Sequence, residues 1–99
     1  MTQYYKLCGR LGQTREGPVV SRAVICTPEG DDDRALELAR SWGQQVHHTN
    51  GVDLVEVYAM PPMFSPQAKE PEKLRWTLVV GPGTEGYREP PLYYEQTLR

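Results

Sequence analysis

Four short runs of apolar and β-branched residues predict the strands of a sheet. They cover residues 4–11, 19–26, 52–60 and 74–80, and glycines, prolines or polar residues bound each of them. The first two runs lie close together in the sequence and are separated by a glycine- and proline-containing segment, which is typical of a hairpin. We therefore expect a mostly antiparallel sheet whose strands are short.

The alternation along the first two runs shows which side chains share a face of the sheet. Tyr5 and Leu7 fall on one face, because successive residues of a strand point to opposite sides of the sheet. In the second run Arg22 marks the solvent side, so Ala23 and Ile25 are assigned to the core. The third run carries charged residues on both faces, and its inward side stays open.

A helix is predicted between the second and third runs. The spacing of its apolar residues is i, i+3, i+4, i+7 and i+11, which gives one continuous stripe made of Ala35, Leu38, Ala39, Trp42 and Val46. Three acidic residues at its start suit the positive end of a helix dipole, and one of them can cap the free N–H groups. Gly43 is expected to weaken the last turn, and Asn50-Gly51 to end the helix.

These elements predict an α+β fold in which one helix packs on a mostly antiparallel four-stranded sheet, in the order ββαββ. A length of 99 residues fits a single domain spanning 1–99. Its irregular parts are a long proline-rich loop at 60–73 and an extended C-terminal tail at 87–99, in which Leu92, Tyr93 and Tyr94 are candidates for a short edge strand.

Composition and charge narrow the range of partners. The 11 Lys and Arg nearly balance the 13 Asp and Glu, for a net charge of -2. Duplex DNA and anionic membranes are bound through clustered cations, so nucleic acid is not the expected partner. No apolar run approaches the roughly 18 residues of a membrane span, and the N-terminal sequence lacks the apolar stretch of a secretory signal. We expect a cytoplasmic protein with no membrane association.

One pattern matches a cofactor-binding motif. Gly81, Gly83 and Gly86 give a literal G-x-G-x-x-G after a predicted strand. A dinucleotide site requires a helix to begin there, yet Pro82 intrudes and no helical pattern follows. A turn is the better interpretation, and no cofactor is expected.

The candidate metal ligands and nucleophiles are few. Cys8, Cys26, His47 and His48 lack the paired spacing of a zinc site, and we expect both cysteines to be free thiols. The acidic run at 31–33 lacks the alternate spacing of a calcium loop. A cysteine paired with one of the histidines is the only catalytic constellation available, so an enzyme is not the expected class.

The remaining candidates are surface aromatic, methionine, arginine and acidic residues, a composition that is typical of protein interfaces. The predicted partner-binding residues are Met63, Phe64, Tyr87, Arg88, Tyr93, Tyr94, Asp31, Asp32 and Asp33. The alternative interpretation is that the aromatic residues cover sheet edges or pack beneath the loop.

The leading hypothesis is a non-enzymatic protein-binding module, such as a small inhibitor, regulator or assembly factor of a phage or mobile element. A single-stranded nucleic-acid binder is the first alternative, with sheet aromatics stacking on bases and Arg22, Arg75 and Arg88 holding phosphates. A thiol enzyme or small-ligand protein is the second. A homodimer, formed through the edge at Tyr93-Tyr94, is also open.

Overall fold

The computed structural model of the chain describes residues 1–61 and 73–84. Within them the elements follow the order ββαββ, as predicted. They are β1 (Thr2–Arg10), β2 (Val19–Pro28), α1 (Asp32–Asn50), β3 (Leu54–Ala59) and β4 (Lys73–Val79). The expected tail at 87–99 and most of the loop at 60–73 lie outside the described residues.

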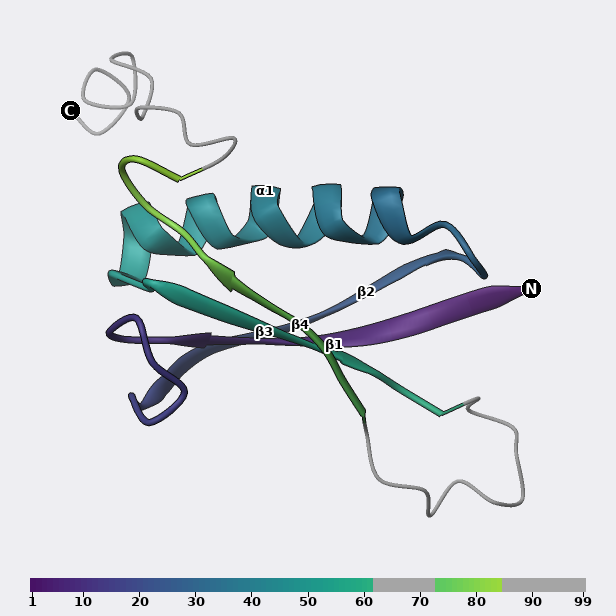
Figure 1. Cartoon of the computed structure of the whole chain (residues 1–99), viewed down its shortest axis with the longest axis horizontal. Helices are drawn as coiled ribbons and strands as arrows, with labels where there is room; N and C mark the ends of the chain where they lie inside the picture. Colours follow the sequence, from purple (N-terminus) through teal and green to yellow (C-terminus); the bar gives the residue numbers. More distant parts are fainter. Residues whose placement is uncertain (62–72, 85–99) are drawn as a thin grey trace, which may run out of the picture.

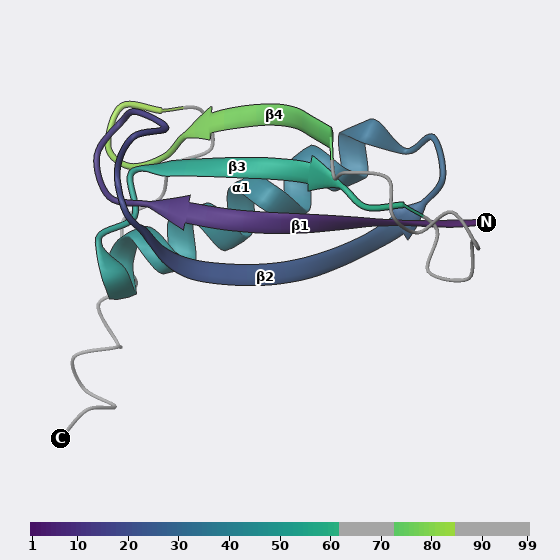
Figure 2. The same cartoon turned by 90° about the horizontal axis from the view of Figure 1, so that it is seen from below.

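The four strands form one antiparallel sheet in the order β2-β1-β3-β4 (Figure 2). β1 and β2 are a hairpin, and the helix carries the chain back so that β3 pairs with the other side of β1. β1 and β3 are thus the central strands, and β2 and β4 are the edges. Within the described residues no helix is long and apolar enough to cross a membrane.

Helix α1 lies across one face of the sheet (Figure 1). Its first turn is capped by Asp31, whose carboxylate accepts a hydrogen bond from the backbone N–H of Arg34 at 3.1 Å. Its last turn ends at Gly51, which has a φ of 75° and donates its N–H to the carbonyl oxygen of His47. Both ends lie where the sequence predicts them, because residues that satisfy the free backbone groups stand at each end.

The core lies between the helix and the sheet. Tyr5 and Leu7 from β1 and Val55 and Val57 from β3 are buried with small residues of the helix, so the face of β1 that Tyr5 and Leu7 share is the inward one. Residues packed against this cluster include Ala23, Ile25, Trp42, Val46, Ala59, Trp76 and Leu78. Ala23 and Ile25 therefore face the core as predicted, and the inward side of β3, open from the sequence, is the valine side.

Gly43 has a role that differs from the predicted one. The residues of α1 that are fully buried are Ala35, Ala39 and Gly43, four residues apart, and the larger residues of the stripe are only half-buried. A Cβ at position 43 would lie 2.7 Å from Cγ1 of Val80 and 3.0 Å from Cγ2 of Val55. The glycine lets the helix backbone approach the sheet, and the helix continues past it to Asn50.

Candidate functional site

No helix of the described residues covers the face of the sheet opposite α1, which is called the open face here (Figure 2). Its side chains alternate with those that enter the core, and the register places Lys6, Cys8, Arg22 and Glu56 on it. Further members are Tyr4, Arg10, Val20, Val24, Cys26, Leu54, Tyr58, Thr77 and Val79. The loop between β1 and β2 adds Arg15, whose side chain reaches Glu56.

A buried carboxylate is the centre of this face. Glu56 has no solvent-exposed surface, and each of its two oxygens accepts a hydrogen bond from an arginine. Arg10 donates its Nε–H to Oε1 at 2.6 Å, and Arg15 donates its Nε–H to Oε2 at 2.5 Å. Arg10 also donates to the carbonyl oxygen of Gly17 at 2.6 Å. The carboxylate thus attaches the hairpin loop to the centre of the sheet.

The charge state of Glu56 follows from these contacts. Burial acts to raise its pKa, but hydrogen bonds from Arg15, Arg10 and Tyr58 outweigh that effect and hold the pKa below its ordinary value. The side chain is therefore ionised at neutral pH. Two guanidinium groups share one carboxylate, so this cluster retains one positive charge.

Apolar and cationic side chains surround the cluster. Val24 is 59% exposed, Val79 is 43% exposed and Val20 is 39% exposed. Lys6 lies with its Nζ 5.2 Å from the centroid of the Tyr58 ring, and Arg22 is exposed on β2. Among the described residues, the open face and its hairpin loop thus combine four basic side chains, those of Lys6, Arg10, Arg15 and Arg22, with two acidic ones, the buried Glu56 and the exposed Glu16 of the loop.

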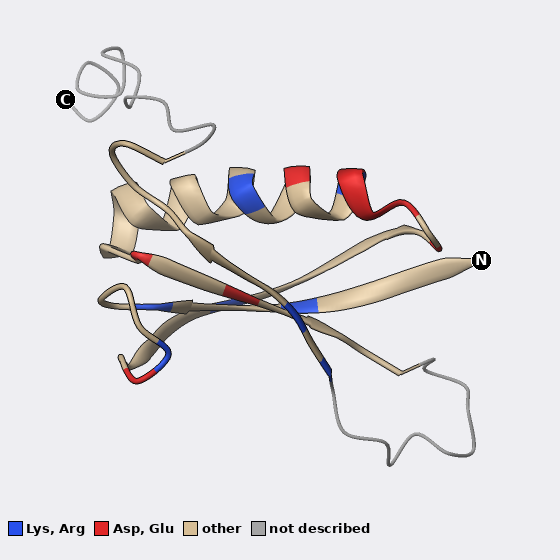
Figure 3. Cartoon of the chain, in the orientation of Figure 1, with Lys and Arg blue, Asp and Glu red and all other residues tan. Residues whose placement is uncertain are grey.

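Acidic side chains gather on the other side of the molecule. The first turns of α1 are mostly red in Figure 3, whereas most of the blue segments lie on the sheet and its hairpin loop, which also carry short red segments. Asp31 and Asp32 have local contacts there, since Asp31 caps the helix and Asp32 lies 3.5 Å from the Arg75 guanidinium. Arg75 in turn stacks on the Trp76 ring at 4.7 Å. The chain therefore has a basic face and an acidic helix start.

The described members of the predicted partner-binding set all lie at the helix start, and none of them is on the open face. Asp31, Asp32 and Asp33 lie together at the start of α1, away from the open face, and their proposed role in binding stays a prediction. Six others lie outside the described residues, namely Met63, Phe64, Tyr87, Arg88, Tyr93 and Tyr94.

The contribution of the Asp31 cap to stability can be measured by substitution. Asp31→Ala removes the acceptor for the Arg34 N–H, and caps of this kind contribute about 1 kcal/mol. We expect the free energy of unfolding to fall by about that amount in a urea titration, with Asp31→Asn retaining most of it. An equal loss in Asp33→Asn, which keeps the cap, would show that the helix start is stabilised by general charge instead.

The cysteine thiols and the His47 imidazole do not lie together in one site. Cys8 and Cys26 are both free, as predicted, and Cys8 is buried on the open face beside Glu56. His47 lies on the helix side, where its Nδ1 is 2.8 Å from the carbonyl oxygen of Val52. A carbonyl only accepts, so Nδ1 carries the proton. No group of three or more metal-ligating side chains occurs among residues 1–61 and 73–84.

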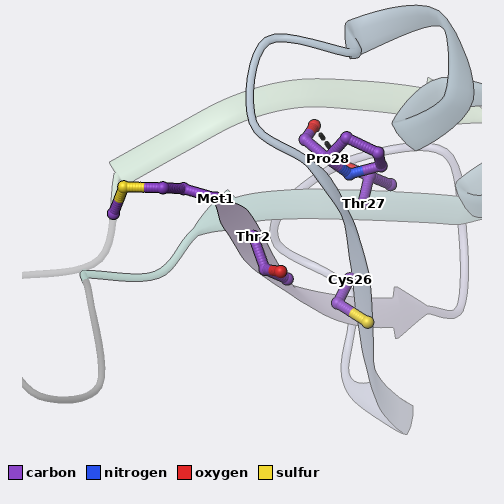
Figure 4. A pocket seen from close by; sticks show the side chains of 5 residues that line it. All are labelled: Met1, Thr2, Cys26, Thr27 and Pro28. Carbon is purple, nitrogen blue, oxygen red and sulfur yellow. Dashed lines mark hydrogen bonds between the residues drawn. The ribbon is translucent and has the colours of Figure 1, made fainter.

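A shallow hollow occurs where β1 begins and β2 ends. It is lined by Met1, Thr2, Cys26, Thr27 and Pro28 (Figure 4). The Thr27 hydroxyl donates to the carbonyl oxygen of Pro28 at 3.2 Å, so it is already engaged. No histidine, carboxylate or arginine of the described part of the chain lines the hollow, and the stronger candidate is the open face.

The glutamate–arginine cluster is the feature that sequence reasoning missed. A glutamate inside the apolar run LVEVY was the available signal, because a charge flanked by valines in a central strand needs a partner when it is buried. The identity of that partner follows only from the pairing of β1 with β3.

Comparison of the chain with protein-family models, with curated proteins and with solved structures finds no match.

Proposed function

We propose that this chain is a non-enzymatic protein-binding module whose open face binds an acidic, partly apolar surface of another protein. The observation that carries the proposal is the composition of that face with its hairpin loop, which places exposed valines among four basic side chains, one buried carboxylate and one exposed carboxylate, that of Glu16. An interface gains affinity from apolar contact and gains specificity and association rate from complementary charge. The uneven distribution of charge favours a partner that is acidic.

The rigidity of the face also supports a binding role. Arg10 and Arg15 are fixed by Glu56, so little side-chain freedom is lost when they contact a partner. Arg10 stands on β1 and Glu56 on β3, the two central strands, whereas Arg22 and the exposed valines stand on the edge strands. The glutamate–arginine cluster at the centre of the face is therefore expected to keep its geometry without a bound partner.

The nucleic-acid alternative has weaker support. Base stacking requires accessible rings, yet Tyr4 and Tyr58 are only partly exposed and Lys6 lies over the Tyr58 ring. Arg22 is on one edge strand, whereas Arg75 is on the other and contacts Asp32. Arg88 lies outside the described residues. The two described arginines thus do not form one phosphate-binding track.

The thiol-enzyme alternative also lacks a converged site. Cys8 is on the open face and His47 is on the helix side of the sheet. Cys26 pairs with Tyr4, whereas His47 lies near Val52, beside the opposite end of β1. A nucleophile and its base must lie within hydrogen-bonding reach, and these pairs lie on different faces or at different ends.

Charge reversal on the open face tests the proposal. We expect the tagged protein to retain one stoichiometric partner from its native host, and Arg22→Glu to weaken that complex at least about tenfold in a binding titration. The matched control is Asp33→Arg, which reverses an exposed charge at the helix start, a change of equal magnitude and opposite sign. Nuclease treatment before capture separates a protein partner from nucleic acid.

Two outcomes contradict the proposal. Loss of the partner in Asp33→Arg with retention in Arg22→Glu would move the site to the acidic helix start. Loss of the retained material on nuclease treatment would favour the nucleic-acid alternative. Circular dichroism of both variants checks that the fold is unchanged.

A further inference from the structure

The two edges of the sheet are protected to different degrees. β4 carries Lys73 and Arg75, and a register shift interrupts its pairing with β3. Charges and bulges of this kind prevent an edge from pairing with another chain. β2 is ten residues long, pairs regularly with β1 from Ser21 to Pro28, and has Arg22 as its only charged residue. Pro18 precedes β2 and Pro28 is its last residue, so most of this edge could still pair with another strand.

The direction of the backbone groups on β2 follows from the hydrogen bonds of β1. The carbonyl oxygens of Tyr4 and Arg10 accept from Met60 and Asp53, so even-numbered residues of β1 direct their polar groups toward β3. Odd-numbered residues of β1 therefore bond to β2, because the two sides alternate in an antiparallel ladder. The register pairs these with Ser21, Ala23 and Ile25.

The backbone N–H and C=O groups of Arg22, Val24 and Cys26 consequently point outward. Among the described residues no strand pairs with this side of β2. The side chains of the same three residues lie on the open face, and Val24, in the middle, is 59% exposed. The edge thus presents a row of unpaired backbone N–H and C=O groups, with a β-branched residue at its centre. Such an edge is the usual template on which another strand pairs.

We propose that two copies of this chain pair through β2, antiparallel and with Val24 opposite Val24 of the second copy. The choice of register follows from charge and length. A pairing centred on Arg22 would place like charges opposite each other, which is destabilising. A pairing centred on Cys26 would use only the end of the strand before Pro28. The Val24 register uses residues 20–28 of both copies and places Arg22 opposite Cys26.

This pairing produces one continuous eight-stranded sheet. On the helix side, Ala23 of one copy lies opposite Ile25 of the other, and both are only half-buried in the single chain. On the other side, the two open faces join across the Val24 pair. A two-fold axis relates the copies, which is the commonest symmetry of soluble dimers. The inference is independent of the proposed function, because it concerns the purified chain alone.

A proline substitution tests the pairing. Val24→Pro removes an N–H that the monomer does not use, and proline is tolerated at an edge when that group faces solvent. In sedimentation equilibrium we expect the wild-type protein to be a dimer and Val24→Pro to dissociate at least about tenfold more readily. Val24→Thr is the matched control, since it keeps both the N–H and the branched side chain. A wild-type monomer at every soluble concentration would overturn the proposal, as would equal dissociation of the proline and threonine variants.

Cysteine cross-linking tests the register even where the proline variant does not fold. With Cys26→Ser in the background, Val24→Cys places a thiol opposite its counterpart, at a separation that a disulfide can span. We expect a linked dimer on oxidation with oxidised glutathione. Val20→Cys in the same background is the control, because position 20 lies opposite Pro28 of the second copy. Linking of Val20→Cys as readily as Val24→Cys would overturn the proposed register.

Discussion

Replacing Gly43 by leucine will destabilise the protein by at least about 3 kcal/mol, because a side chain at this position has no space between α1 and the sheet. A Cβ alone would lie 2.7 Å from Cγ1 of Val80, and the nearby Val55 is fully buried. The helix would have to move away from β3, which would expose core residues. In a domain of this size such a loss lowers the Tm by more than about 12 °C.

The alanine variant gives a finer measurement. Alanine is the better helix former by about 1 kcal/mol, whereas overpacking costs about 1–3 kcal/mol, so we expect Gly43→Ala to be less stable by about 1 kcal/mol. Ser41→Ala is the control at an exposed position of the same helix, and it should stay within about 0.5 kcal/mol of the wild type. Thermal and urea unfolding measure all three variants. A gain of stability in Gly43→Ala would show that the helix is not held as close to the sheet as the structure places it.

The fold could be predicted from the sequence because its local signals agree with one another. The apolar stripe, the acidic start and Asn50-Gly51 define one helix, and the alternation in residues 4–11 and 19–26 defines a hairpin. Each signal depends on near neighbours in the chain, where spacing determines which side chains share a face. The structure confirms the order of the elements and the core assignment of Ala23 and Ile25 on β2.

What could not be predicted depends on contacts between distant residues. Gly43 was expected to weaken the helix, because the sequence does not reveal which turn of the helix passes closest to β3. The partners of Glu56 are 46 and 41 residues away in the chain, so no local pattern identifies them. The sequence also leaves the core side of β3 unassigned, because the run 52–60 has a charged residue on each face. Only the contacts of Glu56 with distant arginines explain how one of those charges can be buried. The candidate site therefore became visible only through the register of the sheet.

Glu56→Ala is expected to lower the free energy of unfolding by about 3 kcal/mol, the lower end of the range for breaking a buried ion pair. The substitution leaves Arg10, whose side chain is only 22% exposed, beside Arg15 with no carboxylate between them. Arg15 is 57% exposed and can return to solvent, which limits the loss. Arg15→Ala is the matched control, and it should cost no more than about 1 kcal/mol because Arg10 still compensates Glu56. Equal losses in the two variants would contradict a central role for the carboxylate.

The same residue predicts how stability depends on pH. The pKa of Glu56 is lower in the folded chain than in the unfolded chain, so its contribution is fully present above the ordinary glutamate value of about 4.3. That contribution is lost as the pH falls through the lowered pKa, since the protonated side chain no longer attracts the two guanidinium groups. Glu56→Gln lacks this titration, so its free energy of unfolding should fall less steeply with acid, and the difference from the wild type should shrink toward low pH. Urea titrations of both proteins between neutral pH and pH values below the ordinary glutamate range measure this, and parallel profiles would mean that the arginines do not hold Glu56 in its ionised form.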